Sequence, residues 1–364
     1  MNKAYKYRIY PNAAQRELFA KTFGCVRFIY NKMLADKIAH YQETGKMLPT
    51  TPAQYKQEYP WLSEVDSLAL CNAQLHLQTA YRNFFRDKKI GFPKFRSKKA
   101  RRNSYTTNMV GNNIAIFDGY LKLPKAGMVK AKFHRQIPED NKIKSVTVSM
   151  SADGKYYASI LTEYEAAISS VDLNPQNVLG LDYSSPHFYV DSEGHTAEMP
   201  HYYRKAECTL AREQRKLSRM VKGGSNYQRQ KMAVAKLHAK VRNQRKDWQH
   251  KVSRKVADNW DIVCVEDINL KGMAQGLHLA KATNDNGFGQ FRTYLAYKLA
   301  EQGKMLITID KWYPSSKLCR KCGGINTELT LADRSWICPS CGSLIERDHN
   351  AAINIRNAGL AMIA

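Results

Sequence analysis

The pattern of apolar and polar positions changes its period several times along the first half of the chain. Residues 3–10 alternate as in a β-strand, and Pro11-Asn12 ends the run. From about 13 to 41 the apolar residues recur at three- and four-residue steps, which is the period of a helix packed on one face. Another helix is predicted over 66–86. The chain therefore begins with one strand followed by helices.

Short runs typical of β-strands follow between residues 105 and 165. They cover 113–117, 120–123, 143–150 and 156–162, and Gly, Pro and Asp turns separate them. A small antiparallel barrel or sandwich fits this pattern. Because the strand at 3–10 has no partner nearby in sequence, we expect it to join this sheet, which makes the helical segment an insertion. Residues 166–177 are predicted to be a linker.

A second folding unit is predicted from residue 178. Two apolar runs close on a carboxylate: Val178 to Asp182, and 261–266 with Glu266 at its end. The predicted elements between and after them are a returning strand at 188–191, helices at 201–221 and 226–259, a polar loop at 271–287, a helix at 288–302, a strand at 305–309 and a helix at 349–357. This order of strands and helices indicates a mixed α/β sheet.

The net charge of the chain indicates a binding partner. The 364 residues contain 57 Lys and Arg against 32 Asp and Glu, a formal net charge of +25. Two or three domains fit this length, and 43% hydrophobic residues can build their cores. A chain this basic favours a nucleic-acid partner over the alternative, a solvated basic surface with no partner.

The excess positive charge is concentrated in two regions. Residues 82–102 hold ten Lys and Arg against one acid, with Phe84, Phe85, Phe92 and Phe95 interleaved. The cations can bind phosphates, and the aromatic rings either stack on bases or anchor the loop, with anchoring favoured. Residues 201–255 hold 17 Lys and Arg against three acids, which favours a helical hairpin facing nucleic acid over a solvated helix face.

Neither export nor membrane insertion is expected. The N-terminus lacks the apolar segment of a signal peptide, and no run of about 18 apolar residues occurs. A cytoplasmic protein is predicted. In that reducing compartment the four isolated cysteines, Cys25, Cys71, Cys208 and Cys264, are interpreted as buried thiols.

Four other cysteines predict a zinc ribbon. Cys319 and Cys322 form one Cys-x-x-Cys pair and Cys338 and Cys341 a second, and a glycine follows each pair. Zn²⁺ takes four thiolates tetrahedrally, and two such turns supply them from a short chain. The alternative, two disulfides, conflicts with the absence of export signals. Since the protein fills all four ligand positions, the zinc is predicted to be structural.

Three carboxylates are candidates for catalysis. Asp182 and Glu266 lie at or near the ends of apolar strands, and Asp348 begins a helix after the ribbon. Each by itself is weak evidence for catalysis, because acids often cap strands and Asp348 is also compatible with a helix N-cap. Together, three carboxylates at strand ends can hold two Mg²⁺ or Mn²⁺ ions about 3.5–4 Å apart, as in metal-assisted phosphodiester hydrolysis.

Six motifs, in this order, give the chain a family resemblance. They are Tyr7-Arg8-Ile9-Tyr10-Pro11-Asn12, Gly91-Phe92-Pro93-Lys94-Phe95, Gly180-Leu181-Asp182-Tyr183-Ser184, Val265-Glu266-Asp267-Ile268, Ser315-Ser316-Lys317-x-Cys319-x-x-Cys322-Gly323 and Arg347-Asp348-x-Asn350-Ala351-Ala352. Over essentially its whole length the chain resembles the TnpB (OrfB) proteins of bacterial insertion sequences. These are RNA-guided DNA nucleases related to compact type V CRISPR effectors.

The resemblance implies a fold, a site and partners. It implies an N-terminal wedge-like β-barrel with a helical insertion, followed by a RuvC-type nuclease core of RNase H-like fold that contains the zinc ribbon. Asp182, Glu266 and Asp348 would bind the catalytic metal, and a guide RNA and target DNA would be the partners. Many relatives carry a Gly-Ile-Asp-Leu-Gly type of first motif, whereas Tyr183 and Ser184 follow Asp182 here.

The implied domains have these boundaries: the first strand of the wedge barrel at 1–12, the helical recognition insertion at 13–104, the rest of the barrel at 105–165, the linker at 166–177, the RuvC-like core at 178–314, the zinc ribbon at 315–345 and the last part of the core at 346–364.

Several functions remain open at the level of sequence. The first is an RNA-guided DNA endonuclease that cuts by two-metal hydrolysis. A guided DNA-binding repressor without nuclease activity is a second, and the presence of all three acids argues against it. A transposase or structure-specific nuclease without a guide is a third, and two separate basic regions are more than it needs. A compact type V CRISPR effector derived from the same family would carry the same acids and ribbon.

Overall fold

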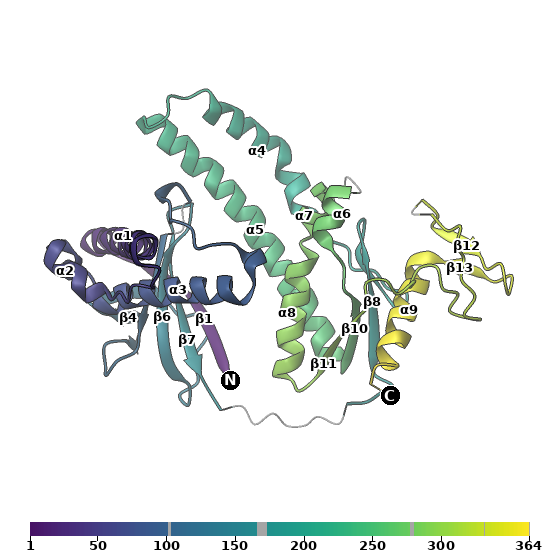
Figure 1. Ribbon diagram of the computed structural model, residues 1–364. Coiled ribbons are helices and arrows are strands. Elements are labelled where there is room, and N and C mark those ends of the chain that lie inside the picture. The colour runs from purple at the N-terminus through teal and green to yellow at the C-terminus, as the bar shows by residue number, and fades with distance from the viewer. Residues whose placement is uncertain (101–102, 166–172, 277–279, 331, 364) are drawn as a thin grey trace. The chain divides into compact units, whose positions relative to one another are not determined.

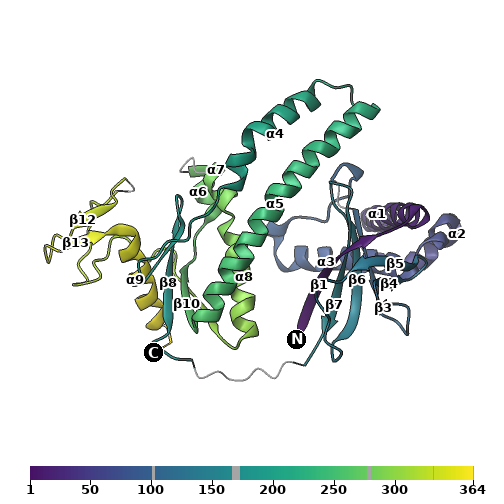
Figure 2. The same ribbon diagram turned by 180° about the vertical axis from the view of Figure 1, so that it is seen from behind.

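The computed structural model describes residues 1–100, 103–165, 173–276, 280–330 and 332–363 (Figure 1, and from behind in Figure 2). The chain divides into two compact units, residues 1–166 and 167–364. This division falls within the predicted linker 166–177, of which residues 166–172 lie outside the described part. Each unit is described by itself.

The first unit combines one antiparallel sheet with helices. Its strands are β1 (Asn2–Tyr10), β2 (Asn103–Asn108), β3 (Ala115–Phe117), β4 (Tyr120–Leu123), β5 (Gly127–Lys132), β6 (Lys142–Met150) and β7 (Tyr156–Glu163). Its α-helices are α1 (Ala13–Thr44), α2 (Tyr55–Glu58) and α3 (Ser67–Arg86), and short 3₁₀ turns are η1 (Pro52–Gln54), η2 (Pro60–Glu64), η3 (Lys88–Ile90) and η4 (Lys98–Ala100).

Strand β1 lies inside this sheet, whose described strands follow the order β2-β6-β7-β1-β5-β4-β3. It pairs with β7 along most of its length and with β5 at its end, so the strand at 3–10 joins the later strands as expected. The alternation buries Tyr7 and Ile9 on the helix-covered face. The strand order ends at β2 and β3, and no hydrogen-bonded pair of described residues joins these two, so a closed barrel stays a prediction.

Helix α1 begins at Ala13, as predicted from the sequence. The Asn12 side chain accepts a hydrogen bond from the Gln15 amide, and the Gln15 side chain in turn accepts one from the Asn12 amide. On its buried face, Phe19 and Phe23 contact the ring of Tyr105 on β2. The helix therefore packs on the sheet through the apolar positions that recur at helical steps.

The aromatic residues of the basic segment divide into two kinds. Phe84 and Phe92 meet edge to face at 5.4 Å, and Phe92 also contacts Tyr81, so these rings anchor the loop as favoured from the sequence. Phe85 also contacts Tyr81 and Phe84 although it is 60% exposed, whereas Phe95 is 57% exposed and contacts no other ring of the described residues. Anchoring thus accounts for only part of the set.

The second unit is an α/β fold. Its strands are β8 (Val178–Ser184), β9 (Phe188–Asp191), β10 (Ile262–Glu266), β11 (Met305–Ile309), β12 (Ser335–Ile337) and β13 (Leu344–Glu346). Its helices are α4 (Tyr202–Ser218), α5 (Ser225–Asn259), α6 (Leu270–Gly276), α7 (Ala280–Asn286), α8 (Phe288–Glu301) and α9 (Arg347–Leu360).

A four-stranded sheet forms the centre of this unit, in the order β11-β10-β8-β9. β10 runs parallel to β8 and β11, and β9 returns antiparallel to β8. Alternate residues of β10 enter two cores: Val263 packs with Phe291 of α8, and Cys264 packs with Ile355 of α9. Because helices cover both faces of this sheet, its strands are buried on both sides, and their sequences are therefore continuous apolar runs.

The prediction of a polar loop at 271–287 is wrong. The structure has α6 and α7 there, with residues 277–279 outside the described part. Asp285 and Asn286 are buried: Asp285 accepts a hydrogen bond from the Tyr203 amide, and Asn286 donates to the Tyr183 hydroxyl. These polar residues form hydrogen bonds with groups of distant elements. Their polarity alone therefore suggests a solvated loop.

The four isolated cysteines differ in their exposure. Cys25 and Cys264 are buried, but Cys71 and Cys208 are exposed on helices, so the prediction of four buried thiols is wrong for two of them. An isolated cysteine on an amphipathic helix gives no sign of which face it occupies.

Within the described residues, no helix has the length and apolar character needed to cross a membrane.

Candidate active site and four-cysteine cluster

The register of two parallel strands brings the first two acids to one edge of the sheet. Leu181 of β8 pairs with Val265 of β10, and Asp182 and Glu266 are the next residue of each strand. The carboxyl ends of parallel strands meet at the same edge, where open α/β sheets place their ligands. The apolar runs therefore position these two carboxylates without help from any loop.

The third acid arrives on helix α9, which lies directly on β8. Asp348 is the second residue of that helix. The close approach depends on Gly180, because a Cβ atom there would lie 2.0 Å from the carbonyl oxygen of Ala352 and 2.8 Å from the amide nitrogen of Arg356. Gly180, two residues before the first acid, thus allows the helix that carries the third acid to come near it.

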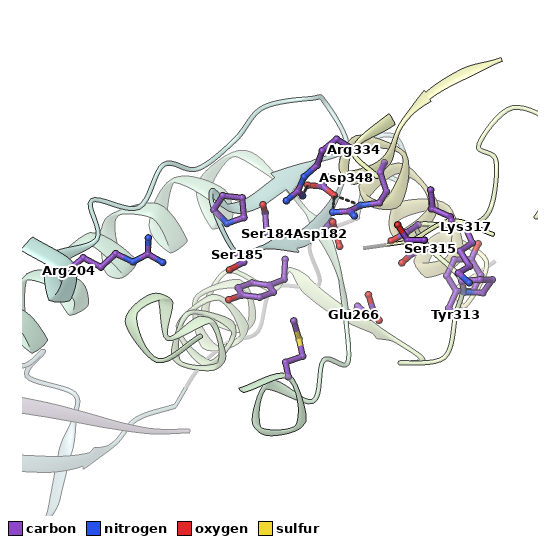
Figure 3. A pocket seen from close by; sticks show the side chains of 18 residues that line it. Asp182, Ser184, Ser185, Arg204, Glu266, Tyr313, Ser315, Lys317, Arg334 and Asp348 are labelled. Atoms are coloured by element: carbon purple, nitrogen blue, oxygen red, sulfur yellow. Dashed lines mark hydrogen bonds and ion pairs between the residues drawn. The ribbon is translucent and has the colours of Figure 1, made fainter. Parts of the chain in front are cut away.

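All three acids line one pocket of about 990 Å³. Figure 3 shows Asp182 and Asp348 together on one side and Glu266 apart from them. Among the described His, Cys, Asp and Glu side chains, the four cysteines are the only group of three or more whose ligand atoms all lie within 4.8 Å of one another. The three carboxylates therefore share a cavity without closing on a single point.

The pocket disfavours negative charge on two of these acids. Burial, and then the charges of Asp348 and Glu266, raise the pKa of Asp182 well above its ordinary value. Burial raises the pKa of Glu266 to about 7, although a hydrogen bond with Ser315 opposes the shift. A cation bound between the carboxylates would remove this penalty.

Asp348 is compensated by arginines. The Arg347 guanidinium donates to one carboxylate oxygen, with Nη2 at 2.8 Å and Nε at 2.9 Å. Arg334, which precedes β12, lies 3.6 Å from the other oxygen. The Asp348 side chain is 14% exposed, so these pairs are partly shielded from water. Arginines thus compensate Asp348, whereas the pocket raises the pKa values of the other two acids.

Sequence reasoning missed the role of two asparagines that join the ribbon to α9, although Asn350 belongs to the sixth motif. Asn350 and Asn354 are buried, and the side-chain nitrogens of both donate to the carbonyl oxygens of Ser315 and Leu318. The Asn350 oxygen also accepts from the Arg320 amide. Their four-residue spacing on one helix face was the available signal. They hold the first cysteine turn against the helix that carries Asp348.

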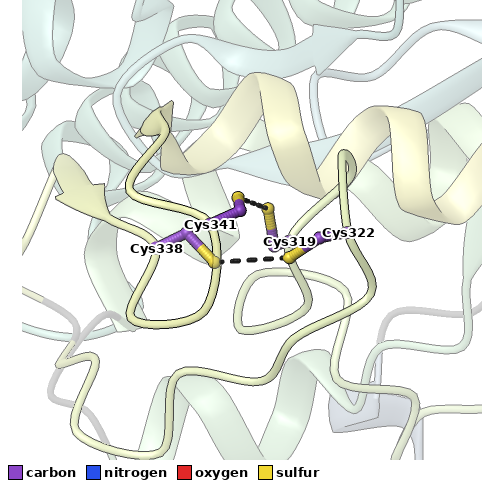
Figure 4. A group of neighbouring side chains, drawn as sticks. All are labelled: Cys319, Cys322, Cys338 and Cys341. Carbon is purple, nitrogen blue, oxygen red and sulfur yellow. Dashed lines mark hydrogen bonds between the residues drawn. The ribbon is translucent and has the colours of Figure 1, made fainter.

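The four cysteines converge as predicted (Figure 4). The Cys319 and Cys341 sulfurs are 3.8 Å apart, and those of Cys322 and Cys338 are 3.6 Å apart. Thiolates on a tetrahedral Zn²⁺ at about 2.3 Å are separated by about 3.8 Å, whereas a disulfide needs about 2.05 Å. The cluster has the spacing of a metal site and not of two disulfides.

Local hydrogen bonds shift the pKa values of the cluster's thiols in opposite directions. Although the Gly324 amide opposes the shift, hydrogen bonds with the other cysteines raise the pKa of Cys322 to about 12. The Ser343 hydroxyl lies 3.4 Å from the Cys341 sulfur. Hydrogen bonding with the Ser343 side chain, and next with its backbone, lowers the pKa of Cys341 to about 6. Gly323 and Gly342 have φ angles of +73° and +69°, which is the left-handed conformation that lets each turn fold under the sulfurs.

Three family models match successive parts of the chain. An OrfB_IS605 model described as "Probable transposase" matches residues 159–276, and a Cas12f1-like TNB domain matches 288–355. A model described as a helix-turn-helix domain, HTH_OrfB_IS605, matches residues 1–46. That segment folds here as strand β1 followed by the single long helix α1.

Full-length relatives and one solved fold extend these matches. A protein of Streptomyces pristinaespiralis named "Putative RNA-guided DNA endonuclease" is 35% identical over 376 residues, covering 100% of this chain and 91% of that protein. InsQ of Escherichia coli (strain K12), which carries the same description, is 30% identical, covering 100% and 93%. The fold is similar to Cas12f1 in its cryo-EM complex with sgRNA and target DNA, with a TM-score of 0.65 and 13% identity over 98% of this chain and 99% of that one.

Proposed function

Because the chain belongs to the TnpB (OrfB) family, we propose that it is an RNA-guided endonuclease that hydrolyses phosphodiester bonds in DNA, with a guide RNA and a target DNA as its partners. One observation carries the proposal. The acids of three separate motifs, Asp182, Glu266 and Asp348, line a single cavity beside the four-cysteine cluster. A cavity that collects carboxylates in a chain of net charge +25 suits a metal-dependent reaction on a polyanion.

In this proposal the three carboxylates hold Mg²⁺ or Mn²⁺. The residues fit these ions, since hard oxygen donors surround a pocket that penalises uncompensated negative charge. Oxygens on one Mg²⁺ lie within about 4.2 Å of each other, so the wider spacing of the three acids suits two ions better than one. Bound divalent ions supply an activated water and stabilise the leaving oxygen.

The protein's own groups prepare the acids for these ions. Ser315 hydrogen-bonds with Glu266 and favours its ionised form. The arginines at positions 334 and 347 pair with the Asp348 carboxylate and orient it before any cation enters. The positive charge of Arg347 also favours the ionised form of Asp182, although burial outweighs it. The site is therefore organised in advance of metal binding.

We assign the cysteine cluster to a structural Zn²⁺. Four thiolates leave no position for substrate, and the sulfur spacing fits a tetrahedral ion. Through Asn350 and Asn354, this ribbon is fastened to the helix that carries the third acid. Zinc thus acts on the reaction by fixing the position of Asp348.

The domain assignment follows the same family. We propose a RuvC-like core at 178–314 and 346–364, a zinc ribbon at 315–345, and a wedge-like barrel at 1–12 and 105–165 with a recognition insertion at 13–104. Within 201–255 every acid already pairs with a lysine or arginine, which leaves the remaining cations of α4 and α5 for nucleic acid. We propose a cytoplasmic location, because the relatives are bacterial and the proposed partners are DNA and RNA.

The test begins with the RNA that copurifies from the native host. Its sequence defines the guide segment and therefore the DNA target. The purified complex is expected to cut that DNA with Mg²⁺, and an Asp182→Ala complex is expected to bind the same RNA without cutting. A repeat-derived RNA would favour a CRISPR-associated effector over a transposon-encoded one. Cutting by the variant at the rate of the native protein would refute the site.

A further inference from the structure

The catalytic pocket contains one cation whose role the carboxylates do not explain. Four lysine and arginine side chains line it: Arg204, Lys317, Arg334 and Arg347. Three of them are engaged within the protein, since Arg334 and Arg347 pair with Asp348, and Lys317 donates to the Thr327 carbonyl 3.2 Å away. Arg204 makes no hydrogen bond or ion pair with any described residue, and it is exposed.

The position of Arg204 separates it from the acids. It lies in the first turn of α4, and Figure 3 shows its guanidinium on the far side of Ser184 and Ser185 from the carboxylates. Tyr313 and Lys317 lie at the opposite end of the same pocket. The arginine is therefore in the cavity yet too far from the metal-binding groups to compensate them. Figure 3 shows its guanidinium extending toward the pocket that it lines.

The base of this helix is held firmly, which fixes where the arginine projects. The Tyr203 amide donates to the buried Asp285 carboxylate at 3.1 Å, and Arg245 and Gln249 of α5 donate to the backbone carbonyls of Asp285 and Asn286. A guanidinium on a rigid element loses less freedom when it binds a phosphate, and its planar fork matches phosphate oxygens.

We propose that Arg204 is a phosphate-binding point for the substrate strand. It would bind a backbone phosphate beside the one that is cut, and so set the register of the strand over Asp182, Glu266 and Asp348. The strand would then cross the pocket from Arg204 toward Lys317. Phosphate contacts of this kind position a nucleic acid without reading its sequence, as a guided enzyme requires of its nuclease site. This inference rests on the proposed nuclease function.

A charge-deletion scan tests the contact directly. Target DNA is synthesised with a neutral methylphosphonate at one position at a time around the cut, and single-turnover cleavage is measured for complexes of full-length protein and copurified RNA. With native protein, one position near the cut is expected to slow cleavage about 10- to 100-fold. With Arg204→Ala, cleavage of unmodified DNA is expected to slow by a similar factor. Neutralising that same position should then have no further effect.

Two matched variants complete the experiment. Arg204→Lys should restore part of the rate and of the sensitivity at that position. Lys311→Ala removes an exposed cation that lies outside α4 and α5 and does not line the pocket, and should behave as native protein. If the Arg204→Ala complex keeps the native sensitivity at every position, the phosphate contact is refuted, while a native complex that still cuts leaves the nuclease function standing. Failure of native protein to cut any target would instead refute the function.

Discussion

The four-cysteine cluster and the carboxylate pocket both collect anionic ligand atoms, but they do so in opposite ways. The cysteines come from one short stretch, 319–341, and their sulfurs close on a point with spacing suited to a tetrahedral ion. The acids come from positions 182, 266 and 348, and they line an open cavity. A closed set of ligands suits a structural ion, whereas an open one leaves room for water and substrate.

The two regions also differ in how they tolerate their own charge. In the cluster, hydrogen bonds with Ser343 lower the pKa of Cys341 and so favour the thiolate. In the pocket, burial raises the pKa values of Asp182 and Glu266 and so favours the neutral acid. The cluster therefore favours the thiolate at Cys341 but not at Cys322, whereas both shifted acids of the pocket favour the neutral form, at a cost that bound cations would relieve.

The largest expected effect separates the two regions by removing one carboxylate. Asp182→Asn keeps the shape of the side chain and removes its charge. Several kcal/mol of lost transition-state stabilisation corresponds to a decrease in cleavage rate of about 10³-fold or more. Single-turnover cleavage measures the rate, and metal analysis should find the zinc content unchanged. Loss of zinc in this variant would show that the two sites are not independent.

The converse change removes one ligand from the cluster. Cys338→Ser leaves three thiolates, so zinc content should fall from about one ion per chain toward none, and residues 315–346 should become sensitive to protease. The cleavage rate should decrease as well, because the first cysteine turn, to which Asn350 and Asn354 are hydrogen-bonded, would no longer be held in place beside the helix that carries Asp348. Cys71→Ser, an exposed cysteine outside the cluster, is the matched control and should leave both measurements unchanged.

A smaller effect is expected from the connection between the regions. Asn350→Ala removes a buried donor and acceptor and leaves the Arg320 amide without its partner, at a cost of about 1–3 kcal/mol, while Asn354 still donates to the Leu318 carbonyl. Cleavage should decrease about 10-fold while zinc is retained, because the cysteines are intact. Asn357→Ala, on the exposed side of the same helix, provides the control. Native cleavage in Asn350→Ala would mean that the ribbon does not position Asp348.

The smallest effect concerns pH. Glu266 has an ordinary pKa of 4.5 and about 7 in the fold, so the native state binds more protons than the unfolded state between these values. Its contribution to the free energy of unfolding is therefore present below pH 4.5 and declines as pH rises through 7. The raised pKa of Asp182 acts in the same direction. Divalent cations must displace these protons to bind.

Thermal unfolding with and without Mn²⁺ measures this coupling. The increase in Tm produced by Mn²⁺ should be larger at pH 8 than at pH 6, by a few degrees for a change of about 1 kcal/mol. Glu266→Gln should reduce the difference between the two pH values. An increase in Tm that is equal at both pH values in native protein would contradict the assignment of these acids as ligands.

The sequence by itself determined the features whose evidence is local. Two Cys-x-x-Cys turns with their glycines specify a cluster because ligands close in sequence are close in space. Apolar runs that end in Asp182 and Glu266 predict a common edge because parallel strands align their ends. The motifs that support the family resemblance are likewise short and ordered. Each of these inferences follows from period, spacing or residue type alone.

Tertiary structure decided which distant polar groups meet. Nothing in the sequence pairs Arg334 with Asp348, or Asn350 with the carbonyl of Leu318, and residues such as Asn286 looked solvated until their buried partners appeared. The free position of Arg204 in the pocket is of the same kind. Hydrogen bonds and ion pairs depend on distance through space, and the separation of two residues along the chain does not contain that distance.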